Sequence, residues 1–232
     1  MAHSLRENLR IVNPQKSRYF RAKILEWHKS NKRSFPWRKT KNPYYILIAE
    51  ILLQQTDAAK VAKEYSSFIR TFPKPKKLAA ASKSSVNRFI SKLGLDYRVN
   101  RLISIARELK KKFNGRVPDT EEKLLKLPGI GPYIANAVLA SAYNKRAAVL
   151  DTNIVRILDR FFGIKSSKPR PRTDPMLWLV AYQLLPQKTN MCKTWNYALL
   201  DFAALVCTHY HPNCDLCTLR RCCNFLSKMC SN

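Results

Sequence analysis

Four cysteines near the C-terminal end of the chain have a spacing that could hold a metal centre. Cys207, Cys214, Cys217 and Cys223 follow the pattern C-x6-C-x2-C-x5-C. Their segment has no helix or strand pattern of its own, so a metal bound by four thiolates would be needed to hold it folded. Zinc is usually bound by two separated, short-spaced cysteine pairs, whereas this segment has a single C-x-x-C. The spacing is therefore less typical of zinc than of another four-thiolate centre.

The segment LPGIGPY (127–133) predicts a tight turn between two helices, the first ending at Lys126 and the second starting near Pro132. Gly129 and Gly131 allow positive φ angles and the close approach of another molecule. The first N–H groups of the second helix have no partner within that helix. Such a turn can bind a phosphate through backbone amides, although a plain packed turn would also explain the glycines.

Two carboxylates stand next to apolar runs. Asp151 comes directly before the helical pattern NIVRILDRFF, where residue type alone favours a helix cap. Glu50 lies among Ile51, Leu52 and Leu53, where a carboxylate is costly unless it is paired or functional. Both are therefore candidate catalytic groups.

Helical periodicity dominates the chain, and we find no convincing run of alternating strand residues. The pattern predicts helices over 17–29, 43–57, 59–70, 84–92, 98–113, 121–126, 133–143, 153–162, 174–185 and 193–206. Polar or proline-bearing joints are expected at 39–43, 72–77, 114–118 and 166–175. The predicted fold is all-α.

The charge balance narrows the class of partner. The chain has 43 Lys and Arg against 15 Asp and Glu, a formal net charge of +28. Such a surface attracts polyanions, so nucleic acid is favoured over a merely soluble lysine-rich surface or a ribosomal or membrane-surface protein. No secretory signal or membrane-length apolar run is found. We expect a soluble intracellular protein, cytoplasmic or nucleoid-associated, with no membrane partner.

The cysteine spacing resembles the [4Fe–4S] loop of the endonuclease III and MutY group of DNA repair glycosylases. The resemblance implies that Cys207, Cys214, Cys217 and Cys223 bind a [4Fe–4S] cluster. Cys222 fits the last position less well, because only four residues separate it from Cys217 whereas five separate Cys217 from Cys223. Cys192, Cys222 and Cys230 are interpreted as ordinary thiols.

Two further segments carry the same resemblance, which covers residues 30–225. L-P-G-x-G-x-Y resembles the helix-hairpin-helix motif of this superfamily, and AAVLDTNIVRILDRFFG resembles its signature segment with the aspartate at Asp151. FPWRKTKNPYYILIAEILLQQT (35–56) resembles MutY-type adenine glycosylases and the thymine/uracil mismatch glycosylases. The implied catalytic residues are Asp151, Glu50, Tyr133 and Asn153, and the implied DNA-binding residues are Gly129, Gly131, Gln54, Gln55 and Tyr197.

Tyr133 indicates the reaction type. Endonuclease III-type members have a lysine at this position, whose amine forms the Schiff base that precedes strand cleavage. Tyrosine cannot form that base. The resemblance therefore implies a monofunctional base excision repair DNA glycosylase that leaves an abasic site without efficient AP-lyase activity.

The sequence leaves two alternatives for the identity of the excised base. Gln54 and Gln55 resemble the adenine glycosylases, whereas Asp57 and Ala58 resemble the thymine mismatch enzymes, and Tyr197 matches neither subgroup cleanly. Few residues follow the cysteine loop, so we expect no C-terminal domain of the kind by which MutY-type enzymes recognise 8-oxoguanine.

LGLDYRVN (93–100) also lacks the Gly-Tyr-Tyr run of the adenine enzymes. We favour removal of T or U opposite G over removal of adenine opposite G or 8-oxoguanine. A non-catalytic iron-sulfur DNA-binding protein is a further alternative, and a ferredoxin-like electron carrier would explain only the cysteines.

The resemblance also implies an architecture. Residues 30–140 would form a six-helix lobe with the helix-hairpin-helix at 121–143. Residues 1–29 and 141–232 would form a cluster lobe with the [4Fe–4S] loop at 207–223. We expect a monomer that binds double-stranded DNA containing a mismatch in the cleft between these lobes.

Overall fold

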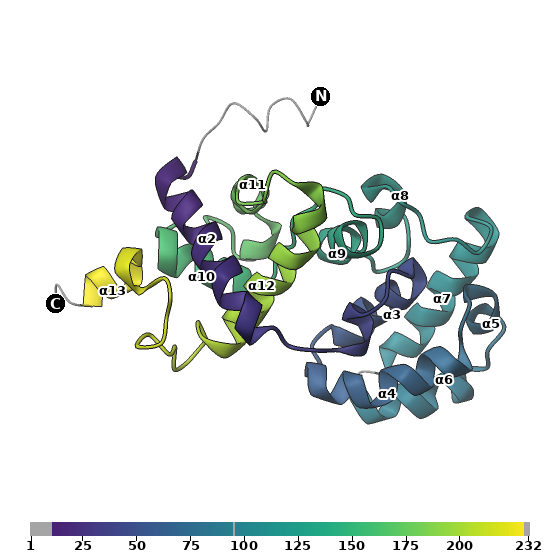
Figure 1. Ribbon diagram of the computed structural model, residues 1–232. Coiled ribbons are helices and arrows are strands. Elements are labelled where there is room, and N and C mark those ends of the chain that lie inside the picture. Colours follow the sequence, from purple (N-terminus) through teal and green to yellow (C-terminus); the bar gives the residue numbers. More distant parts are fainter. Residues whose placement is uncertain (1–10, 95, 230–232) are drawn as a thin grey trace. The chain divides into compact units, whose positions relative to one another are not determined.

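The computed structural model describes residues 11–94 and 96–229 (Figure 1). These residues form helices and no strand, so the all-α prediction is confirmed. Cys230, interpreted above as an ordinary thiol, lies outside the described residues. None of the helices in the described part of the chain is long and apolar enough to cross a membrane.

The chain divides into two compact units. We call Ser34–Lys145 the hairpin unit, because it contains the glycine turn. Met1–Arg33 together with Arg146–Asn232 is called the cysteine unit. The boundaries fall at 33/34 and 145/146, beside the positions 29/30 and 140/141 that the resemblance implies.

The described part of the hairpin unit contains seven α-helices, one more than the sequence predicts. Its elements are η1 (Pro36–Arg38), α3 (Pro43–Leu53), α4 (Ala58–Thr71), α5 (Pro75–Ala79), α6 (Lys83–Ile90), η2 (Ser91–Leu93), α7 (Tyr97–Lys112), α8 (Glu121–Leu125) and α9 (Pro132–Ala142). The additional helix, α5, begins inside 72–77, where a joint was expected. Pro75 occupies its first turn, where a missing N–H breaks no hydrogen bond, and Leu78 is fully buried.

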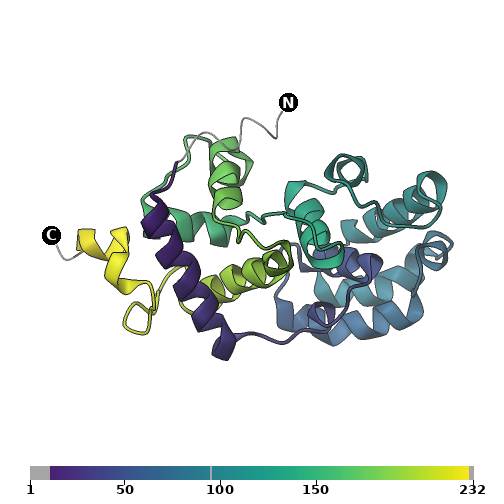
Figure 2. The same cartoon turned by 45° about the horizontal axis from the view of Figure 1, so that its top comes forward.

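Helix α3 forms the centre of the hairpin unit. Its sequence, PYYILIAEILL, is apolar on nearly every side, and a helix of that kind is stable only when surrounded by other elements. It packs against α4, α7 and α9 (Figure 2). Small residues on α9, among them Ala135, Ala137 and Ala140, are buried. They allow helices to approach closely.

The predicted extension of this helix to residue 57 is wrong, because α3 ends at Leu53. Gln55 takes a positive φ of 55°, a conformation that an α-helix does not contain. Asp57 then caps α4, its Oδ1 accepting the N–H groups of Ala59 and Lys60. Gln54 and Gln55 therefore lie on an irregular turn between two helices.

The cysteine unit is built around its two longest described helices, α2 and α12. Its described elements are α2 (Pro14–Asn31), α10 (Thr152–Ile157), the π-helical turn η3 (Leu158–Phe162), η4 (Pro171–Thr173), α11 (Pro175–Gln183), η5 (Thr189–Met191), α12 (Cys192–Leu205), η6 (Arg220–Cys222) and α13 (Asn224–Met229). The turn η6 lies inside the cysteine segment, where no helix was expected. It rests on local i to i+3 hydrogen bonds, which are too short a pattern for periodicity to reveal.

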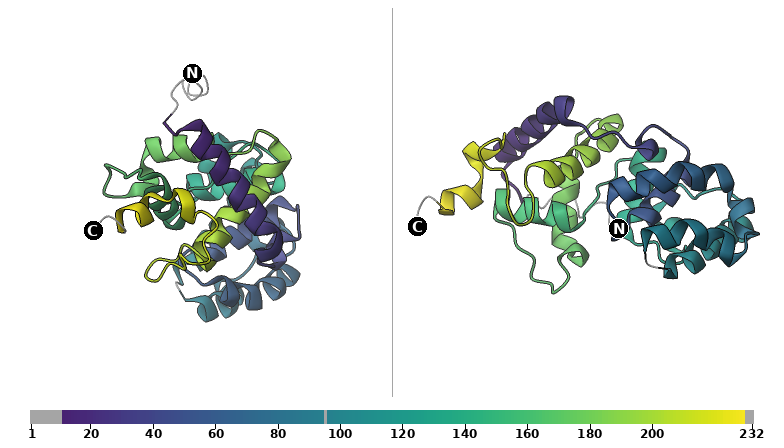
Figure 3. Two further views of the ribbon diagram at one scale, coloured as in Figure 1. Left: turned by 60° about the vertical axis from the view of Figure 1, so that its left-hand side comes forward. Right: turned by 90° about the horizontal axis from the view of Figure 1, so that it is seen from below.

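Helices α2 and α12 pack side by side (Figure 3). The Phe20 ring of α2 lies 4.9 Å from that of Phe161 and 5.7 Å from that of Trp195, measured between centroids. Buried Asp201 on α12 accepts hydrogen bonds from the backbone N–H and Nε of Arg33, at 3.0 and 2.6 Å. These contacts join segments far apart in the sequence.

Candidate functional site

Asp151 lies at the N-terminus of α10, and both of its carboxylate oxygens are engaged. Oδ1 accepts the backbone N–H of Ile154 at 2.8 Å, which caps the helix. Oδ2 accepts a hydrogen bond from Nδ2 of Asn153, also at 2.8 Å. The side chain is half-buried. Asp151 is thus a helix cap and, at the same time, a carboxylate whose plane is fixed by two donors.

Arg156 extends this arrangement to the cysteine segment. Its Nη1 donates to Oδ1 of Asn153 at 3.0 Å, while Nη2 donates to the carbonyl of Ala203 at 3.0 Å and Nε to the carbonyl of Cys207 at 2.9 Å. A continuous chain of hydrogen bonds therefore runs from Asp151 through Asn153 and Arg156 to the first cysteine of the segment. A guanidinium fills this position well because its donors point in three fixed directions.

Arg160, four residues after Arg156, also binds the cysteine segment. Its guanidinium donates to the carbonyls of Thr208 and His209 and lies 3.6 Å from the Cys207 sulfur. The Cys223 thiol is 3.5 Å from the Arg160 carbonyl. Arg160 therefore contacts both Cys207 and Cys223, the first and last cysteines of the spacing pattern.

The four cysteines of the pattern lie near enough for their charges to interact. Burial raises the pKa of the Cys217 thiol to about 11, and the charges of Cys223, Cys207 and Cys214 contribute to the rise. The charge of Cys222 acts on Lys16 and Tyr19, to which Cys223 and Cys217 respectively also contribute. Within residues 11–94 and 96–229, no three His, Cys, Asp or Glu side chains take up a metal-binding arrangement. The four sulfurs thus lie near one another but not in the geometry of a coordination site.

The glycine turn joins α8 to α9, as predicted, with Lys126 at the end of α8 and Pro132 in the first turn of α9. Gly129 has a φ of +71°, and a Cβ atom there would lie 2.5 Å from Nε of Arg101. The positive φ therefore favours glycine at this position, and an added side chain would also require the Arg101 side chain to shift.

Gly131 differs from Gly129. Its φ of −101° is open to any residue, and a Cβ atom would meet no described atom within 4 Å. It forms the N-cap of α9 without any side-chain hydrogen bond, so the first amides of the helix are left without a capping side chain. Nothing in the described part of the fold requires glycine at this position.

The remaining predicted residues are distributed over both units. In the hairpin unit, Glu50 is only 5% exposed in the middle of α3, and Tyr133 lies half-buried in the first turn of α9. In the cysteine unit, Tyr197 lies half-buried on α12, with the Lys193 ammonium 6.0 Å from its ring centroid.

Sequence reasoning missed the arginines that hold these residues. Arg101 donates from Nη1 to Oε1 of Gln54 at 2.7 Å, and Arg156 and Arg160 hold the cysteine segment. In a chain with 43 Lys and Arg, no single arginine stands out. The four-residue interval between Arg156 and Arg160 was a usable signal, because residues so spaced share one face of a helix.

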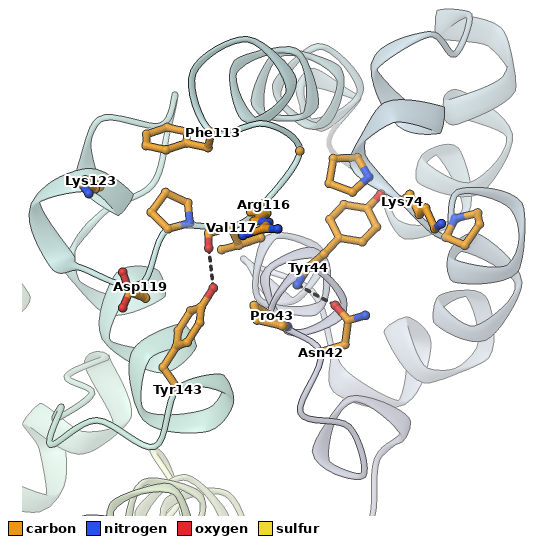
Figure 4. Close-up of a pocket in the computed structure, with 14 residues that line it drawn as sticks. Asn42, Pro43, Tyr44, Lys74, Phe113, Arg116, Val117, Asp119, Lys123 and Tyr143 are labelled. Atoms are coloured by element: carbon orange, nitrogen blue, oxygen red, sulfur yellow. Dashed lines mark hydrogen bonds between the residues drawn. The ribbon is translucent and has the colours of Figure 1, made fainter.

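A cavity of about 630 Å³ lies in the hairpin unit and contains none of the predicted site residues (Figure 4). Tyr44 and Tyr143 lie on two sides of it, and the basic residues Lys74, Arg116 and Lys123 also line it. The hydroxyl of Tyr143 donates to the Val117 carbonyl. The cavity is thus a feature separate from the glycine turn.

Comparison with known proteins identifies the class to which this fold and these residues belong. Residues 48–179 match the sequence profile of the HhH-GPD superfamily of base excision DNA repair proteins. The chain belongs to this superfamily, as the helix-hairpin-helix and Asp151 segments predict.

Individual relatives narrow the comparison. A thymine-DNA glycosylase of Aeropyrum pernix is 40% identical over 88% of this chain and 92% of its own. An adenine DNA glycosylase of Buchnera aphidicola subsp. Baizongia pistaciae is 36% identical over 86% of this chain but only 56% of its own. The solved structure of a thermostable thymine-DNA glycosylase matches with a TM-score of 0.87 at 35% identity, covering 92% of this chain and 98% of that one. The resemblance to both glycosylase subgroups is confirmed.

Proposed function

We propose that this protein is a monofunctional DNA glycosylase that removes thymine or uracil opposite guanine and leaves an abasic site. The observation that carries the proposal is the likeness to thymine-DNA glycosylase over nearly the whole length of both chains. The adenine alternative has less support, since its relative matches over little more than half of its own length.

The glycine turn gives this enzyme a way to hold a duplex. The start of α9 has no capping side chain at Gly131, and the positive end of the α9 dipole favours a phosphate there. Contacts of this kind position DNA without reading its sequence. The net charge of +28 adds affinity that falls steeply with salt concentration.

The proposed reaction breaks the bond between the sugar C1′ and the base nitrogen of a flipped-out nucleotide. Flipping costs a few kcal/mol and least where the base is mispaired, which favours mismatches as substrates. Glu50 supplies a proton to the departing base, directly or through water. Asp151 stabilises the positive charge that develops on the sugar, and water then adds at C1′ while its surplus proton passes to the carboxylate left at Glu50. Asn153 holds the Asp151 carboxylate in plane through its 2.8 Å hydrogen bond.

Tyr133 is proposed to contact the flipped-out nucleotide without forming a covalent bond to its sugar. A phenol cannot form the Schiff base that a lysine amine forms. Borohydride trapping on a G·T duplex therefore should yield little covalent adduct. Efficient trapping would contradict the monofunctional assignment.

The cysteine segment is proposed to bind a [4Fe–4S] cluster through Cys207, Cys214, Cys217 and Cys223. Four gathered thiols fit such a group, and coordination removes the cost of keeping neighbouring thiolates charged. When bound, the cluster would fold the segment and take no part in bond cleavage. Iron and sulfide analysis of protein purified without oxygen tests this, and zinc without iron would overturn it.

A panel of duplexes tests the substrate. Each carries T, U, A or hypoxanthine opposite G or 8-oxoguanine, and released bases are counted after alkaline cleavage of the abasic sites. We expect rapid release of T and U opposite G. Preferential release of adenine would replace this proposal by the adenine alternative, and release from none would leave a non-catalytic DNA-binding protein.

A further inference from the structure

Arg101 is the point at which three elements of the hairpin unit meet. It lies on α7, donates from Nη1 to Oε1 of Gln54 at 2.7 Å, and places its guanidinium 5.0 Å from the centroid of the Tyr97 ring. Its Nε lies where a side chain at Gly129 would begin. The arginine side chain is therefore held between the turn that follows α3 and the glycine turn.

This contact fixes which way the Gln54 amide faces. A guanidinium has five donors and no acceptor, so it can bond only the oxygen of an amide. Turning the amide over would set its NH2 group against the guanidinium, donor against donor. The Nε2 group of Gln54, with two hydrogens, must point away from Arg101. Within the described residues no hydrogen bond is made by this group.

Gln54 is thereby restricted to one kind of partner. A donor that points away from Arg101 fits a base with a carbonyl oxygen at position 4 of a pyrimidine or position 6 of a purine, as in thymine, uracil and guanine. It meets unfavourably the amino group that cytosine or adenine has at that position, because both groups donate. A free glutamine would accept either kind of base by turning its amide.

We propose that Arg101 is a positioning residue that makes Gln54 selective for keto bases. The inference rests on the proposed function and deepens it, since it gives a physical reason for preferring G·T and G·U to pairs that contain adenine. The carbonyl belongs either to the flipped pyrimidine or to the guanine left in the helix. Because Arg101 also lies against Gly129, the selective group is held directly to the turn that grips the phosphate.

The test measures affinity and single-turnover base release on matched duplexes. G·T is compared with 2-aminopurine·T, which lacks the guanine O6, and G·U with G·2-pyrimidinone, which lacks the uracil O4. The proteins are wild type, Arg101→Met and Arg107→Met. Arg107 is a matched control on the same helix, where its Nε donates to the Ala79 carbonyl at 3.3 Å.

For wild type we expect loss of the relevant carbonyl to weaken affinity about fivefold to tenfold. In Arg101→Met this ratio should fall to about twofold or less, while Arg107→Met should keep the wild-type ratio. Pairing strength within each duplex is the same for all proteins and cancels. The duplex pair whose ratio collapses identifies the source of the carbonyl. Unchanged ratios in Arg101→Met would overturn the inference.

Two further variants keep the test decisive if Arg101→Met is poorly folded. Gln54→Glu keeps the contact with Arg101 but has only acceptors, so it should lose the keto preference. Gln54→Leu should show no further loss when Arg101→Met is added, because both act through one contact. A failure to release any base with the expected affinity ratios intact would refute the proposed function alone. Base release with ratios unaffected by these variants would refute the inference alone.

Discussion

The two candidate sites are both built on the first turn of a helix, but these helix starts are used in opposite ways. Helix α10 begins with Asp151, whose carboxylate accepts the Ile154 N–H and so closes the helix end. Helix α9 begins with Gly131, which offers no capping side chain. We therefore propose that the N-cap residues suit the two helix starts to different roles, Gly131 to the approach of a phosphate and Asp151 to the presentation of a carboxylate.

The two sites also differ in what holds them. The glycine turn is defined by local backbone conformation, with Arg101 packed beside Gly129. Asp151 depends on a chain of side chains that reaches Cys207, more than fifty residues away, through Asn153 and Arg156. Distant changes should therefore disturb the carboxylate more than the turn.

The largest expected effect comes from Asp151→Asn. An amide keeps the helix cap but loses the charge that stabilises the transition state, so base release should fall about a thousandfold. Single-turnover release from a G·T duplex measures this, with the midpoint of thermal unfolding as a control. Asp151→Ala should lose the same activity and, in addition, about 1 kcal/mol of stability. Equal base release by wild type and Asp151→Asn would end the catalytic assignment.

Arg156→Met tests the chain of hydrogen bonds. Asn153 would lose its anchor and the Cys207 carbonyl its donor, so base release should fall about thirtyfold, roughly 2 kcal/mol, with DNA affinity nearly unchanged. Increased labelling of Cys207 by a thiol reagent should accompany the loss. Arg70→Met, which removes an exposed positive charge from α4, serves as the control. A parallel loss of rate in that control would show that charge alone is responsible.

Gly129→Ala should act on folding. Its φ of +71° and the contact with Arg101 predict a loss of about 2 kcal/mol in the free energy of unfolding, measured with urea. Wild-type stability in this variant would mean that the turn adapts easily.

Gly131→Ala should act on binding and leave stability within about 0.5 kcal/mol of wild type. Because the added methyl group stands where a phosphate would approach, affinity for duplex DNA should fall about fivefold. The dependence of log affinity on log salt should also become shallower by about one contact. Equal DNA affinity and equal salt dependence in wild type and variant would show that no phosphate binds at this turn.

Much of the fold could be predicted because its signals are local. The bounds of α9 follow from Pro132 and the glycines before it, and the buried position of α3 follows from its unbroken apolar sequence. The end of α3 could not be predicted, since "LLQQT" continues a helical pattern and the positive φ of Gln55 has no residue-type signal. The short helix α5 was missed because five residues are too few to show a period.

The sequence by itself determined the candidate residues of the proposed chemistry: the cysteine spacing, the glycines of the turn, and the carboxylates Glu50 and Asp151. Local chain properties and residue identity are sufficient for these. Only the tertiary structure decided which side chains hold them, namely Arg101 for Gln54 and Arg156 for Asn153. A hydrogen bond between residues 47 positions apart depends on how whole helices pack, and no pattern along the chain encodes that packing.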